Sequence, residues 1–213
     1  SALLLGNPNP QENFWIETAT ELCRNTLGCL TFLPHRYTLY DLYHYLFDQA
    51  VREAIQAELT TLQETLEPPQ QRLLNSYLRY ETTIFATFEE KVKSNVRATI
   101  AQVLAPFCHP ELIDAFCRPA DLSLQALLDG AVYLVSLPLS RWGLGAKVAY
   151  TFIKLRFFNL MQSRQQQPDW NQTRPVVLMC DEYQTIISAN KDGLSDLNFW
   201  DKSRASKTIG MIS

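Results

Sequence analysis

The first half of the chain carries apolar side chains at every third or fourth position, which is the period of an α-helix. Short polar or proline-containing segments divide this pattern into five stretches, and only Gly6 and Gly28 precede residue 130 as glycines. The apolar positions of the five stretches span residues 14–30, 42–46, 55–66, 73–85 and 92–104. This arrangement predicts a helical bundle with short turns, and we assign residues 8–118 to an all-α domain.

Capping residues and prolines place the ends of these helices. Asn9 precedes a proline and is followed three positions later by Glu12, which together predict a helix start. Thr38 and Asp41 have the same spacing and predict a second start. Pro34 ends the first helical stretch, because proline cannot donate the backbone hydrogen bond that a helix interior needs.

The pattern changes near residue 121, where apolar runs of strand length alternate with helical segments. Strands and helices in alternation predict a parallel sheet covered by helices, and continuous apolar runs are typical of strands buried on both faces. We therefore expect an α/β fold in residues 121–213, with a parallel sheet and flanking helices, after the helical bundle of the first half. The predicted order is a short helix at 121–130, a strand at 131–138, a helix at 144–163, a strand at 176–180, a helix from Ser195 to Ala205, and a strand from residue 208.

The composition is that of an ordinary globular protein, with 46% apolar and 19% charged residues among 213. The formal net charge is −3, so the whole chain has no basic field that would attract nucleic acid. No run of about 18 apolar residues occurs, which argues against a membrane-spanning helix within the chain. Five cysteines without a C-x-x-C pair predict reduced thiols and a cytosolic compartment. The chain begins without Met and stops inside an apolar run, so we expect it to be truncated at both ends.

Two adjacent carboxylates, Asp181 and Glu182, follow the apolar run "VVLMC". Ligands of open parallel sheets bind at the carboxyl ends of the strands. In nucleotidases an aspartate at such a position holds magnesium, usually through water, and a neighbouring glutamate polarises the attacking water. The alternative is that the two carboxylates only meet solvent at the end of a strand, and this motif by itself leaves both interpretations open.

Three residues near the start of the long helix, Gly143, Gly145 and Lys147, resemble part of a phosphate-binding loop. The P-loop motif G-x-x-x-x-G-K-[ST] needs a longer spacing and a hydroxyl residue after the lysine, whereas Val148 stands here. We therefore favour a glycine turn that leads into a helix. The motif occurs nowhere in the 213 residues, so this sequence does not hold both halves of an ATP site.

Two sets of basic residues have both a structural and a functional interpretation. Arg204 would stabilise the C-terminus of the last predicted helix, or it would reach across a subunit interface to another subunit's nucleotide. Lys91, Lys93 and Arg97 would line a substrate-entry surface, although we favour a solvated helix face. The three scattered histidines are assigned no chemistry.

The segments resemble, in the right order, the TraG/TraD-like coupling ATPases of type IV secretion and conjugation systems. "PVVLMCDEYQTI" is similar to the Walker B strand of that family, and "DLNFWDKSRASKTIGMIS" is similar to its arginine-bearing helix and the next strand. "DGAVYLVSLP" resembles the preceding strand, and "NFWIETATELCRNTL" resembles the helix that opens the family's all-α domain. The resemblance is specific over 130–213 and weaker over 35–110.

The resemblance implies a hexameric RecA-like motor that uses ATP and magnesium. Residues 8–118 would be its inserted all-α domain, and residues 121–213 would be part of its RecA-like nucleotide-binding domain. By position, Asp181 would be the magnesium-binding Walker B aspartate, Glu182 the catalytic glutamate and Arg204 a trans-acting arginine. Tyr183 departs modestly from the family, in which a small or apolar residue, often Phe, follows the acidic pair. Walker A would precede Ser1, so we expect neither ATP nor magnesium to bind to this chain alone.

The resemblance also implies a location and partners. The chain would be a cytoplasmic portion of a bacterial inner-membrane-associated protein whose membrane anchor lies upstream. The motor would pump single-stranded DNA or protein into the secretion channel, and its all-α domain would receive secretion substrates or relaxosome proteins. The alternative is a non-enzymatic adaptor, whose helical domain binds such partners and whose α/β part is a degenerate scaffold. A P-loop motif upstream of Ser1 would favour the motor.

Overall fold

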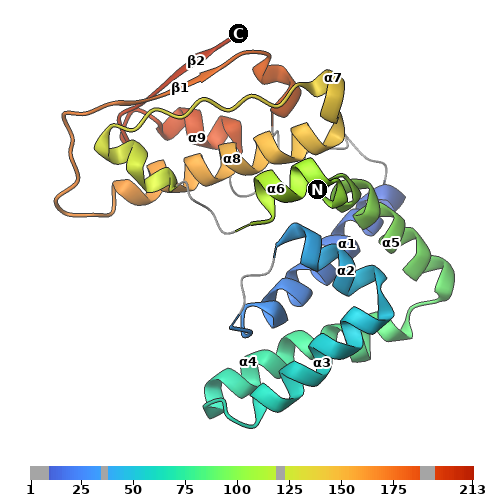
Figure 1. Cartoon of the computed structure of the whole chain (residues 1–213). Coiled ribbons are helices and arrows are strands. Elements are labelled where there is room, and N and C mark those ends of the chain that lie inside the picture. The colour runs from blue at the N-terminus through green and yellow to red at the C-terminus, as the bar shows by residue number, and fades with distance from the viewer. Residues whose placement is uncertain (1–9, 35–37, 119–122, 188–194) are drawn as a thin grey trace. The chain divides into compact units, whose positions relative to one another are not determined.

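A computed structural model describes residues 10–34, 38–118, 123–187 and 195–213 (Figure 1). The chain divides into two compact units on either side of residues 119 and 120. In the described residues of the first unit every regular element is a helix, and the second unit contains helices and two paired strands. The chain is therefore mostly helical with a small parallel sheet, which agrees with the expected helical first half and partial parallel sheet in the second half.

The first unit is built from six α-helices among its described residues. The five predicted helical stretches are confirmed, and a π-helical turn lengthens the fourth of them. The elements are α1 (Pro10–Leu30), α2 (Leu39–Phe47), α3 (Gln49–Gln63), α4 (Pro68–Arg79), the π-helical η2 (Tyr80–Ile84), η3 (Phe85–Thr87), α5 (Glu90–Leu104), η4 (Ala105–Cys108) and α6 (Pro110–Phe116).

Local capping explains where α2 begins. The Thr38 amide donates to the Asp41 carboxylate at 2.8 Å, and the Asp41 amide donates to the Thr38 hydroxyl at 3.3 Å. This reciprocal pair satisfies amide groups that have no partner inside the helix, so the predicted start is confirmed. The other predicted cap, Asn9, lies outside the described residues. The first helix ends at Leu30, before Pro34 is reached.

The core of the first unit lies where α1 packs against α4 and α5. Tyr45 of α2 is fully buried there, and its hydroxyl donates to the Glu81 carboxylate at 2.7 Å. The Gln56 amide donates to the same hydroxyl at 3.3 Å. Because an unpartnered buried hydroxyl is costly, these bonds tie α2 to the π-helical turn and to α3.

Gly28 marks the closest approach between α1 and α4. A methyl group on Gly28 would lie 2.8 Å from ring carbons of Tyr77. We therefore expect Gly28→Ala to destabilise the protein by about 1–2 kcal/mol, since overpacking outweighs the gain in helix propensity. Urea denaturation measures this change.

A second variant isolates the cause of that effect. In a Tyr77→Ala background the ring is gone, so Gly28→Ala should then stabilise by roughly 0.5–1 kcal/mol through helix propensity alone. If Gly28→Ala stabilises the wild-type background as well, α1 and α4 do not pack as closely as the structure shows.

The second unit places helices against one face of a parallel strand pair (Figure 1). The predicted strands at 176–180 and from 208 are confirmed, and they pair in register from Val176 opposite Thr208 to Cys180 opposite Ile212. The elements are η5 (Leu124–Asp129), α7 (Leu139–Trp142), α8 (Leu144–Arg164), β1 (Val176–Cys180), η6 (Tyr183–Ile186), α9 (Asp196–Lys202) and β2 (Thr208–Ile212).

The covered face of the strand pair rests on aromatic rings. Phe158 of α8 stacks on Phe199 of α9 with ring centroids 3.7 Å apart, and both side chains are buried. Gly210 of β2 leaves room for Trp200, because a Cβ there would lie 2.6 Å from the indole. These contacts join α8, α9 and β2 into one core.

The opposite face of the strand pair is exposed. Val177 and Met179 of β1 and Ile209 and Met211 of β2 point to this side, and Met179 is 71% exposed. The expectation that these strands are buried on both faces is therefore wrong for the described chain. The physical reason is that side chains alternate between the two faces, while α8 and α9 cover only one of them.

The prediction of a strand at 131–138 is also wrong. These residues form no regular element and pair with no strand in the described parts of the chain, and Val132 and Leu134 are 92% and 95% exposed. Side chains hold the segment instead of a sheet ladder. The amide of Leu137 donates to the Tyr150 hydroxyl at 2.6 Å, and that hydroxyl lies 3.0 Å from the Leu137 carbonyl.

Candidate functional site

The acidic pair lies at the carboxyl end of the strand pair. Asp181 and Glu182 directly follow β1, and Ser213 follows β2 beside them. The Ser213 amide donates to the Cys180 carbonyl at 3.2 Å, and the Tyr183 amide donates to the Ser213 carbonyl at 3.1 Å. These bonds continue the pairing of β1 and β2 past the last strand residues, so the sheet itself fixes the backbone of the acidic pair.

One oxygen of the Asp181 carboxylate is oriented by hydrogen bonds. Its Oδ1 accepts from the Ser213 hydroxyl at 2.6 Å and from the Glu182 amide at 3.0 Å. Within the described residues no hydrogen bond reaches its Oδ2, and the side chain is exposed. The carboxylate is thus held on one side and open to a ligand or water on the other.

Glu182 has a left-handed backbone conformation, with φ 52° and ψ 40°. A residue with a Cβ occupies this region at a cost of roughly 1–2 kcal/mol, so neighbouring contacts must hold it there. The Thr185 amide and hydroxyl both donate to the Glu182 carbonyl, at 3.0 Å and 2.9 Å. The Glu182 side chain is exposed, immediately beyond Asp181.

The donor set suits a magnesium ion that keeps most of its water. Among the described residues no three His, Cys, Asp or Glu side chains gather where they could hold a metal. Magnesium in nucleotide sites is commonly bound through one or two carboxylates together with water and phosphate oxygens. Asp181, with Ser213 and Glu182 beside it, fits that mode rather than an all-protein cage.

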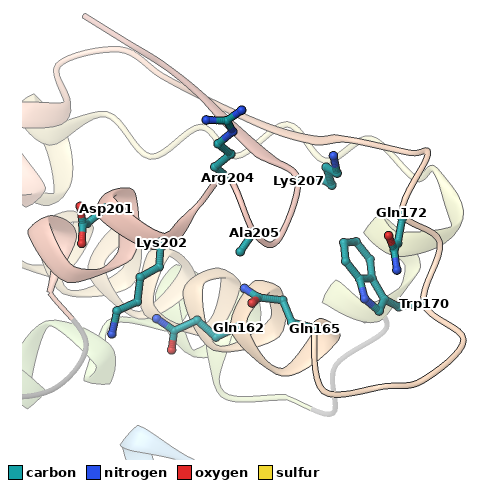
Figure 2. Close-up of a pocket in the computed structure, with 9 residues that line it drawn as sticks. All are labelled: Gln162, Gln165, Trp170, Gln172, Asp201, Lys202, Arg204, Ala205 and Lys207. Carbon is teal, nitrogen blue, oxygen red and sulfur yellow. The ribbon is translucent and has the colours of Figure 1, made fainter.

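Arg204 lies in an open pocket at the other end of the strand pair (Figure 2). The predicted helix through Ala205 ends earlier, at Lys202, so Arg204 belongs to the turn between α9 and β2. It is exposed and extends from that turn in the same direction as Lys207. The pocket has a volume of about 740 Å³ and is lined by Gln162, Gln165, Trp170, Gln172, Asp201, Lys202, Arg204, Ala205 and Lys207.

The structure does not bring Arg204 to the acidic pair. Arg204 precedes β2, whereas Asp181 and Glu182 follow β1, and the two strands run parallel. The five-residue strands separate these groups by a length on the order of 17 Å. Arg204 therefore cannot serve the acidic pair of its own chain from this position.

The glycine turn predicted before the long helix is confirmed, whereas both interpretations of the basic set on α5 remain predictions. Gly143, with φ 48°, forms a turn between α7 and α8, and Lys147 lies within the first turn of α8. In the first unit, Lys93 donates to Glu90 at 2.8 Å on α5, so one cation of the Lys91, Lys93 and Arg97 set is already paired.

A buried polar network beside the acidic pair was missed in the sequence. Lys154 of α8 donates to the Asp196 carboxylate at 2.7 Å, and the Tyr183 hydroxyl donates to the other oxygen of that carboxylate. Burial lowers the pKa of the Lys154 ammonium although Asp196 opposes the shift, and burial raises the pKa of the Tyr183 hydroxyl. A signal existed: Lys154 falls on the stripe of Thr151 and Phe158, which the helical period places toward the core.

Comparisons with family models, curated proteins and solved structures find no match to this chain. In the part of the chain that the structure describes, no helix combines the length and the apolar character needed to cross a membrane.

Proposed function

We propose that the chain is part of a hexameric, ATP-driven coupling protein of the TraG/TraD-like class, which moves DNA or protein substrates into a type IV secretion channel. One observation carries the proposal: an oriented aspartate and an exposed glutamate lie side by side at the carboxyl end of a parallel strand pair. This is where open α/β sheets bind their ligands. Its RecA-like fold and its family are part of the proposal.

The roles of the two carboxylates follow from their environments. Bound magnesium would offset the charge of the ATP phosphates. Asp181 would hold it through water with Oδ2, because Oδ1 is already occupied by Ser213 and the Glu182 amide. Glu182 would orient the attacking water and accept its proton at the exposed carboxylate. Loss of the Glu182 carboxylate would therefore slow ATP hydrolysis much more than it would weaken ATP binding.

Arg204 would act on a different ATP site from the one that its own acidic pair serves. Its place at the opposite end of the strands supports a role across a subunit interface, where a guanidinium stabilises charge on a transferring phosphoryl group. The helical first unit would receive secretion substrates or relaxosome proteins, with the membrane anchor upstream of this chain.

The proposal is tested on the full-length protein that contains this chain. We expect magnesium-dependent ATP hydrolysis, faster when single-stranded DNA or the secreted protein is present. A protein that binds these substrates but hydrolyses no ATP with or without them would instead be the non-enzymatic adaptor, and the proposed motor would be wrong.

A further inference from the structure

We propose that Lys154, Asp196 and Tyr183 are positioning residues that hold the turn carrying Glu182. Their role in catalysis rests on the proposed ATPase, but the contacts themselves do not. Lys154 lies on α8, Asp196 begins α9, and Tyr183 is the residue after Glu182 and the first of η6. Three separate elements therefore meet at one buried carboxylate.

The Asp196 carboxylate is the centre of this network. Lys154 Nζ donates to its Oδ2 at 2.7 Å, and the Tyr183 hydroxyl donates to its Oδ1. The indole of Trp200 donates to the Tyr183 hydroxyl at 3.0 Å. Lys154 and Asp196 are 3% and 6% exposed, so the ion pair is shielded from water and from salt.

The network forms hydrogen bonds with both ends of η6, the short helix that follows Glu182. At its first residue, the Tyr183 hydroxyl donates to Asp196. At its last residue, the Ile186 carbonyl accepts from Lys154 Nζ. On the other side of Glu182 the path is set by β1 and by the bond from the Ser213 hydroxyl to Asp181. The strained backbone of Glu182 is thus fixed from both directions.

The chemistry of the network favours positioning over simple stabilisation. A buried ion pair is often no more stabilising than well-packed apolar residues of similar size, because both charges lose their hydration. A buried ion pair does fix geometry, because each of its hydrogen bonds holds a donor and an acceptor at a defined distance and angle. Here the fixed atoms belong to the residue next to Glu182 and to the end of its turn.

A paired apolar replacement tests the role without leaving a buried charge alone. In the full-length protein, Lys154→Met combined with Asp196→Leu should leave β1 as protected from hydrogen exchange as in the wild type. The peptide covering 182–187 should exchange roughly tenfold faster, because its turn loses both anchors. The kcat for ATP should fall roughly 10- to 100-fold with little change in KM, since misplacement affects the reacting geometry more than binding.

Two further variants serve as a milder change in the network and as a control outside it. Tyr183→Phe, which removes only the hydroxyl, should change exchange and kcat in the same direction by smaller factors. Arg156→Met removes an exposed cation two positions from Lys154 and should change neither.

Hydrogen exchange and ATP hydrolysis test the positioning role and the proposed function independently. If the wild-type protein hydrolyses no ATP, the proposed function is wrong, while the exchange of 182–187 still decides whether the network holds the turn. Unchanged exchange in the double variant would overturn the positioning role. Faster exchange with an unchanged kcat would overturn it too, because the turn would then not matter for hydrolysis.

Discussion

Replacing Phe199 by Ala should destabilise the second unit by about 3–5 kcal/mol, the range measured for buried Phe-to-Ala changes. Phe199 is buried, stacks on Phe158 at 3.7 Å and meets the edge of Trp200 at 5.0 Å. Its removal leaves a cavity where α8, α9 and the strand pair join, and Phe158 cannot fill that cavity without leaving its own contacts. Urea denaturation followed by tryptophan fluorescence measures the loss, since Trp200 lies in the affected core.

The same helix offers a matched control. Leu197 is two positions away and 79% exposed, so Leu197→Ala should stay within about 0.5 kcal/mol of the wild type. A Phe199→Ala protein that unfolds at the same urea concentration as the Leu197→Ala protein would show that the aromatic stack does not hold this unit together.

Local patterns predicted the helical unit well. The helices of the first unit depend on apolar spacing and on caps such as Thr38 with Asp41, and these act within a few residues. The strands β1 and β2 were also predicted, because short apolar runs bounded by polar loops are a local signal. Such features need no knowledge of which segments meet in space.

The errors concern features that depend on distant partners. An apolar run such as 131–138 becomes a strand only when another strand pairs with it, and no described segment does. Likewise, the burial of Met179 depends on whether anything covers its face of the sheet, which the run "VVLMC" does not encode. Strand propensity describes a residue that fits a sheet, not the presence of a neighbour.

The candidate site divides in the same way. The sequence predicted that Asp181 and Glu182 end a strand, because they directly follow an apolar run. It did not predict the left-handed backbone of Glu182, which the Thr185 hydrogen bonds of the turn accompany. Nor did it predict the Ser213 hydrogen bond to Asp181, since that bond joins residues 32 positions apart in the sequence. The position of Arg204 in a turn rather than in a helix depended on a boundary of a few residues, which propensities place poorly.

The Glu182→Gln variant of the full-length protein should bind ATP as the wild type does but hydrolyse it about 100-fold more slowly or worse. Glutamine has nearly the same size and can adopt the same backbone, so the turn and the Asp181 contacts should persist. Its amide cannot accept the proton of the attacking water. As a control, Asp169→Asn alters an exposed carboxylate of the same unit and should leave hydrolysis unchanged.

The central claim is that the acidic pair after β1 is the hydrolytic half of an ATP site. Its most direct test is the steady-state kcat for ATP of the Glu182→Gln protein, measured beside its ATP dissociation constant. The proposed roles predict an unchanged dissociation constant and a kcat lower by about 100-fold or more. Wild-type turnover in this variant would contradict them.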